Sequence, residues 1–126
     1  MLADQITKDN IETMVMNFYS RILKDDLVGP YFIEELGEDM DNKYWPPHLK
    51  RLVDFWASIV LGDTSYKRDP FKPHIMMDDL DHKVFEQWLK LFFKTLDEVY
   101  APQSADIFKE RSRTIAGKFM RNLGVA

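Results

Sequence analysis

A single histidine lies among proline and apolar residues in the segment FKPHIMMD, which spans residues 71–78. Two interpretations fit this residue, His74. A neutral imidazole there could pack in the core and donate one hydrogen bond to a carbonyl, or it could bind a metal or a cofactor. The choice between them depends on which side chains the rest of the chain places opposite His74.

Three further side chains could contribute polar groups beside His74. His48 is expected on an amphipathic helix, Trp88 on the most apolar helix, and Tyr19 at the edge of an apolar stripe. Because a buried phenol O–H or indole N–H generally needs a partner, several such groups around one cavity could donate hydrogen bonds to a polar ligand. Each residue also has a simpler interpretation: Tyr19 as a surface ring resting on the core, and Trp88 as core packing.

The chain contains no cysteine. This excludes disulfides, thiolate zinc sites, iron–sulfur clusters and haem attachment through a C-x-x-C-H motif. Any iron or zinc would therefore depend on the three histidines and the carboxylates. One of these histidines, His82, lies between Asp81 and Lys83 and is expected to be solvated. The motifs H-E-x-x-H and G-x-S-x-G and glycine-rich phosphate loops are missing as well.

The overall composition is that of an ordinary globular protein. Of the 126 residues, 45% are hydrophobic and 30% are charged. The net charge of −4 argues against a nucleic-acid partner, which would favour a basic surface. The N-terminus lacks the apolar core of a signal peptide, and no segment approaches the ~20 apolar residues of a membrane span. We therefore expect a cytoplasmic monomer without a membrane partner, folded as one domain over residues 1–126.

Apolar residues recur at helical spacing nearly throughout, which predicts an all-α fold. In the first expected helix, Asp9 and Glu12 have the spacing of a capping box. The stripe that follows comprises Ile11, Met14, Val15, Phe18, Ile22 and Leu23. A second helix is expected from near Pro46 and Pro47 to Gly62, with His48 in its first turn.

The second half of the chain predicts two more helices after a long loop. The loop DTSYKRDPFKP has no evident element of its own and precedes His74, and a loop of that length invites a functional explanation. The third helix is expected to have Asp81 as its N-cap, with Leu80 and Phe85 in hydrophobic-staple positions. Ser104 is expected to cap the fourth helix, which carries Phe108, Ile115, Phe119 and Leu123 and ends at Gly124.

Several segments together resemble a known family. MNFYSRI, GPYF, HLKRLVDFWASIVLG, FKPH and FEQWLKLF, in this order between about residues 11 and 123, are similar to the bacterial truncated haemoglobins of group III. The resemblance implies a two-over-two helical sandwich around non-covalent haem b. It also implies that His74 is the proximal ligand of the iron and that Tyr19, His48 and Trp88 form a polar distal side.

The resemblance extends to the residues that would contact the cofactor. It implies that Phe32 stacks on the porphyrin, that Leu52 and Phe55 pack over it, and that Phe85 contacts it. Arg51 would reach a propionate. The Gly-Gly pairs of other truncated haemoglobin groups are missing, which favours the third group.

Three functions remain open at this stage. The first is reversible binding of O2, with NO and CO as further ligands, in which distal hydrogen bonds predict slow oxygen release. The second is a haem enzyme with peroxidase-like or NO-dioxygenase activity, which would need an external reductase because the sequence contains no reductase or flavin domain. The third is a haem-free helical interaction module in which the aromatic residues form a plain core.

Overall fold

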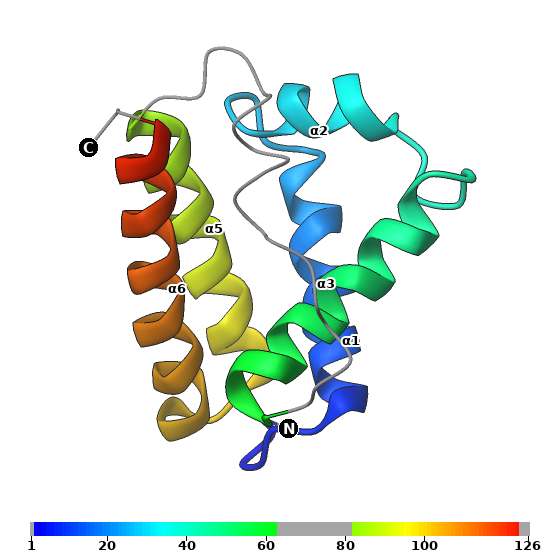
Figure 1. Cartoon of the computed structure of the whole chain (residues 1–126). Coiled ribbons are helices and arrows are strands. Elements are labelled where there is room, and N and C mark those ends of the chain that lie inside the picture. The colour runs from blue at the N-terminus through cyan, green and yellow to red at the C-terminus, as the bar shows by residue number, and fades with distance from the viewer. Residues whose placement is uncertain (1, 63–81, 124–126) are drawn as a thin grey trace.

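The computed structural model describes residues 2–62 and 82–123, except for the side chains of residues 119, 122 and 123. His74, Asp81 and Gly124, which carried sequence predictions, lie outside these ranges. The described residues form helices α1 (Lys8–Ile22), α2 (Gly29–Leu36), α3 (Trp45–Val60), α5 (His82–Val99) and α6 (Pro102–Leu123), drawn in Figure 1. They include no β-strand, only an isolated bridge between Ala3 and Tyr100, so the all-α prediction is confirmed.

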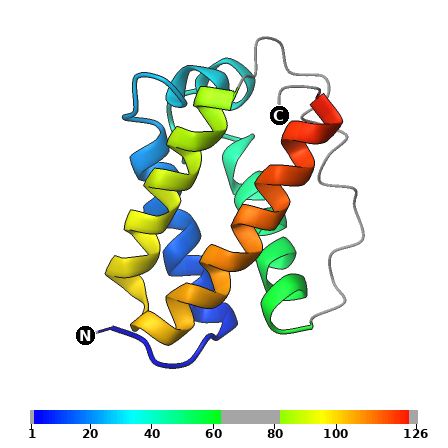
Figure 2. The ribbon, with the colours of Figure 1, turned by 90° about the vertical axis from the view of Figure 1, so that its left-hand side faces the viewer.

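The four longer helices form two layers. Helix α5 packs against α6 and α1, and α1 packs against α3. Figure 2 shows α5 and α6 in front of α1 and α3, while the shorter α2 lies near one end of both layers. This is the predicted two-over-two arrangement. Among the described residues, no helix has the length and apolar character that crossing a membrane requires.

The N-cap of helix α1 lies two residues earlier than the sequence suggested. The N-cap is Thr7, whose hydroxyl accepts from the Asn10 amide at 3.2 Å while the Asn10 side chain accepts from the Thr7 amide at 2.9 Å. The prediction that Asp9 and Glu12 form the capping box is therefore wrong, and Asp9 lies in the first turn. The reciprocal pair satisfies two amides that a helix start otherwise leaves without partners.

The predicted apolar stripe of α1 faces the core. Ile11, Met14, Val15, Phe18 and Ile22 are all buried, and Leu23 is half-buried. Helix α3 also follows the prediction, because it contains both prolines near its start and is followed by Gly62 in a left-handed conformation with φ of 73°.

Helix α6 begins at Pro102, so the prediction that Ser104 caps it is wrong. Proline suits a first helical position because its missing N–H would have no partner there. Ser104 lies in the first turn, and its hydroxyl donates to the carbonyl of Asp4 at 2.6 Å. The buried serine thus fastens the N-terminal segment onto the start of α6.

A series of stacked rings crosses the core between the layers. Trp56 of α3 stacks on Phe92 of α5 with ring centroids 5.0 Å apart, and Phe92 stacks on Trp88 at the same distance. Phe18 of α1 meets both Trp88 and Phe92 edge-on, at 5.2 and 4.9 Å. These contacts hold the half-buried Trp88 against α1 at the margin of the core.

Candidate functional site

Tyr19 lies closer to the centre of the molecule than its place on the edge of the α1 stripe suggested. It is only 4% exposed. Burial raises the pKa of the Tyr19 phenol above its usual value, and a hydrogen bond from the Trp88 side chain opposes that rise. The phenol is therefore neutral over the physiological pH range and keeps a proton to donate.

The hydrogen bond between Trp88 and Tyr19 joins α5 to α1. An indole N–H can only donate, so the phenol oxygen of Tyr19 is the acceptor. A hydroxyl that accepts one hydrogen bond becomes a better donor for a second, because successive hydrogen bonds polarise one another. The pair can thus direct a strengthened O–H donor toward a polar ligand.

His48 joins the same cluster from the first turn of α3. Its ring lies 5.9 Å from that of Tyr19, 5.5 Å from that of Trp45 and 6.5 Å from that of Phe32, measured between centroids. Its Nε2 atom is shielded from solvent. The imidazole is therefore directed inward, toward the aromatic rings, and three of the predicted distal residues come together.

Phe32 of α2 completes the cluster. Its ring contacts the Tyr19 ring edge-on at 5.3 Å and stacks on Trp45 at 6.3 Å. Trp45 is fully buried and donates from its indole nitrogen to the carbonyl of Gly37 at 2.8 Å, which fixes the end of α2 against the start of α3. Trp45 was not among the predicted site residues, because its contacts with α2 form only when the helices pack.

The residues expected to contact a cofactor differ in exposure. Leu52 and Phe55 are half-buried and pack on the outside of the core, as does Ile59 one turn further along α3. Arg51 is exposed, and Phe85 is buried in the first turn of α5 at 8% exposure. Helix α3 therefore presents a partly open apolar surface that continues from the shielded His48.

No protein-family model matches the chain. It is 30% identical over 123 residues to a group 3 truncated hemoglobin of Campylobacter jejuni subsp. jejuni, a match that covers 98% of this chain and 95% of the relative. The crystal structure of the group III truncated hemoglobin from Campylobacter jejuni matches with a TM-score of 0.90 at 30% identity, again over 98% and 95% of the two chains. The chain belongs to the group III truncated haemoglobins. The family and the fold predicted from the sequence are both confirmed.

The described part of this truncated haemoglobin fits the cofactor that its family name implies. A porphyrin needs a broad apolar surface, which the half-buried side chains of Leu52 and Phe55 offer. A ligand bound to the iron of a globin is tuned by polar groups on the distal side, and the buried phenol of Tyr19 is a donor of that kind. Family membership thus supports a globin-type role in haem and gas binding.

Proposed function

We propose that this truncated haemoglobin binds haem b and reversibly binds O2, with NO and CO as further ligands. The observation that carries the proposal is the buried Tyr19, which the rings of Phe32 and His48 enclose and whose phenol is hydrogen-bonded by the Trp88 side chain. Such a donor pair discriminates among diatomic ligands by the negative charge that each gains on binding. O2 gains more than CO does, so the pair favours O2 and slows its release.

Each predicted site residue has a distinct part in this proposal. Haem iron, when bound, supplies the coordination position for the gas. His74 would hold the iron on the proximal side, as the resemblance implies. Leu52 and Phe55 would cover the porphyrin, while the exposed Arg51 suits a propionate at the surface.

Phe32 and Phe85 have supporting parts. Phe32 packs edge-on against Tyr19 and would present its ring to the porphyrin. Phe85, near the start of α5, would add apolar contact to the cofactor. We also propose that residues 1–126 act as one haem-binding domain, since one core cluster among the described residues draws side chains from α1, α3, α5 and α6. The monomer predicted from the sequence stays a prediction.

The distal residues act on the bound gas through hydrogen bonding and through packing. Tyr19 donates its O–H to the ligand, and Trp88 donates to the Tyr19 oxygen and so orients the phenol. His48 packs against the Tyr19 ring from α3 and restricts its rotation. Because Tyr19 is shielded from water, its hydrogen bond to the ligand is stronger than it would be in solution.

Tyr19→Phe tests this proposal through the rate of oxygen release from the reduced, haem-loaded protein. We expect release to accelerate about tenfold or more, because a hydrogen bond to a charged partner is worth roughly 1.5–3 kcal/mol and each ~1.4 kcal/mol is a factor of ten. The rate is measured by stopped-flow absorption after mixing with excess CO.

Tyr100→Phe is the matched control. Tyr100 is also a buried phenol, but it donates to the Asn10 side chain at 2.8 Å, at the other end of α1 from Tyr19. We expect this variant to lose stability while it keeps the wild-type rate of oxygen release. Equal rates for Tyr19→Phe and the wild type would contradict the proposed role of the distal pair.

A further inference from the structure

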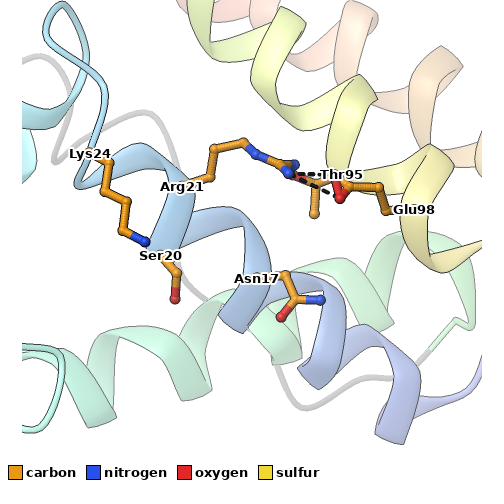
Figure 3. A pocket seen from close by; sticks show the side chains of 6 residues that line it. All are labelled: Asn17, Ser20, Arg21, Lys24, Thr95 and Glu98. Atoms are coloured by element: carbon orange, nitrogen blue, oxygen red, sulfur yellow. Dashed lines mark hydrogen bonds and ion pairs between the residues drawn. The ribbon is translucent and has the colours of Figure 1, made fainter.

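A groove of about 320 Å³ lies between α1 and α5, shown in Figure 3. Its lining residues are Asn17, Ser20, Arg21, Lys24, Thr95 and Glu98. Arg21 reaches across it from α1 and binds two of the residues on α5. The contacts across this groove bear on the distal pair, and the inference drawn from them rests on the proposed function.

Arg21, Thr95 and Glu98 form what we call the Arg21 bridge. One guanidinium nitrogen of Arg21 donates to the hydroxyl of Thr95 at 2.7 Å, and another donates to both carboxylate oxygens of Glu98, at 3.0 Å to Oε2. Thr95 is 1% exposed, and its hydroxyl in turn donates to the carbonyl of Leu91 at 2.9 Å. The bridge therefore anchors an α1 side chain to a buried point of α5 with charge-assisted hydrogen bonds of defined direction.

The bridge lies on the opposite flank of α1 from Tyr19. Each residue of an α-helix turns the side-chain direction by about 100°, so Arg21 lies roughly 60° to one side of Phe18 and Tyr19 about 100° to the other. Phe18 itself packs against Trp88 and Phe92 of α5. Any rotation of α1 about its axis that separated Tyr19 from Trp88 would also have to break the Arg21 bridge.

A second polar contact joins the N-terminal part of α5 to the turn that follows α1. The side-chain amide of Gln87, directly before Trp88, donates to Asp25 at 2.8 Å. The other carboxylate oxygen of Asp25 accepts from the amides of Leu27 and Val28, at 3.1 and 2.8 Å, in the turn that leads into α2. This contact limits sliding of α5 along α1, whereas the bridge limits rotation.

We propose that Arg21 is a positioning residue, whose bridge to Thr95 and Glu98 holds α1 and α5 at the rotation in which the Trp88 indole donates to Tyr19. Glu98 is 52% exposed and Arg21 26%, so an ion pair of this kind adds little to stability. A hydrogen bond, in contrast, weakens steeply when its angle changes. The bridge therefore matters more for the geometry of the distal pair than for the free energy of unfolding.

Arg21→Met tests this inference, because methionine keeps an unbranched side chain and removes every donor. The matched control is Lys109→Met. Lys109 is 19% exposed and pairs at 2.7 Å with Asp97, an acid of α5 that is 58% exposed, but on the side facing α6. Both variants thus remove a half-buried cation from an exposed α5 carboxylate, and only Arg21→Met removes a contact between α1 and α5.

The first measurement is the indole N–H resonance of Trp88 in the ¹⁵N-labelled, haem-free protein, identified by its loss in Trp88→Phe. We expect Arg21→Met to move this resonance upfield, as loss of the hydrogen bond requires, and Lys109→Met to leave it in place. In the haem-loaded protein we expect oxygen release to be roughly fivefold faster in Arg21→Met, as loss of a neutral hydrogen bond of ~1 kcal/mol implies. Arg21→Lys should recover part of both changes, since one ammonium cannot reproduce the forked contact.

An unchanged Trp88 resonance in Arg21→Met would overturn the positioning role. Should Arg21→Met fail to fold, Glu98→Gln carries the test, with a smaller shift expected in the same direction and an unchanged resonance overturning the inference. The two proposals fail separately. A shifted resonance with an unchanged oxygen rate in both Arg21→Met and Tyr19→Phe would sustain the positioning of Trp88 and contradict the proposed function.

Discussion

Tyr19 owes its proposed role to a phenol that stays protonated. Rings from three other positions surround it, with Phe18 at 4.8 Å, Phe32 at 5.3 Å and Trp45 at 5.8 Å between centroids. These rings remove water, which penalises the charged phenolate and raises the pKa of the phenol. A phenolate could only accept a hydrogen bond, so the burial that excludes water also preserves the donor.

The raised pKa of Tyr19 predicts a pH dependence of stability in the haem-free protein. Because the folded-state pKa exceeds the unfolded value of about 10, the stabilisation is fully present below pH ~10 and is lost as the pH rises toward the folded-state value. Tyr19→Phe removes this titration. Above pH ~10, the free energy of unfolding should therefore fall less steeply with pH in Tyr19→Phe than in the wild type. The two slopes should differ by up to about 1.4 kcal/mol per pH unit.

Urea unfolding between pH 8 and pH ~11 measures that slope. Burial raises the pKa of Tyr100 as well, so Tyr100→Phe should flatten the curve to a comparable degree and the double variant should flatten it further. If the free energy of unfolding of Tyr19→Phe fell with pH in parallel with that of the wild type, the phenol would ionise as readily in the folded state as in the unfolded state. That result would contradict the effect expected from its burial.

The sequence indicated Tyr19 and His48 as candidate site residues, but it did not indicate which rings surround them. Helical geometry gives the direction of Tyr19 relative to its own helix, which is why it was assigned to the edge of the stripe. Its burial depends on Phe32 and Trp45, which approach from α2 and α3. The inward direction of His48 likewise depends on contacts with those rings, so neither feature could be predicted from local spacing.

At the level of elements, Gly29 allows α2 to lie close to the end of α1, because it has no side chain. A β-carbon added at Gly29 would lie 2.8 Å from the carbonyl oxygen of Ile22 and 3.2 Å from that of Leu23. Both neighbours are backbone atoms, so they cannot move aside without moving the helix. Gly29→Ala should therefore displace α2, and with it Phe32, at a cost of about 1–3 kcal/mol in the free energy of unfolding.

Gly117→Ala is the control for this substitution. Gly117 lies inside α6, and the nearest atom to an added β-carbon is 3.7 Å away, at the end of the Arg121 side chain. Alanine there should stabilise the protein by up to about 1 kcal/mol, because glycine is a poor helix former. Urea unfolding compares the two variants, and a Gly29→Ala protein as stable as Gly117→Ala would refute the close approach of α2.

Helix ends show where local sequence rules succeed and where they fail. Gly62 was correctly predicted to end α3, because a left-handed residue after a helix favours glycine strongly. Asp9 was wrongly chosen as a cap because Thr7, two residues earlier, also has a capping side chain, and it pairs with an asparagine in place of the usual glutamate. The prediction that Ser104 caps α6 failed because the helix already begins at Pro102.

For the molecule as a whole, the periodic apolar residues and the family resemblance were enough to predict the two-over-two fold, which the structural match confirms. The polar contacts that align α1 with α5 were not predictable. Arg21 contacts Thr95 and Glu98, which are 74 and 77 residues further along the chain, and Asp25 contacts Gln87, 62 residues away. Nothing in the local sequence marks such pairs, because their members meet only after the helices pack.

The central proposal is that this chain binds haem and that the bound haem retains O2. The role of His74 as the proximal ligand stays a prediction. Titration of the purified protein with haemin, followed by reduction and exposure to air, tests the claim by absorption spectroscopy. His74→Ala is compared with His82→Ala, which replaces an exposed histidine paired with Glu86. We predict a stoichiometric Soret band that shifts to a long-lived oxygenated spectrum in the wild type and in His82→Ala, and fails to form normally in His74→Ala. A wild-type protein without a saturable Soret band would contradict the account.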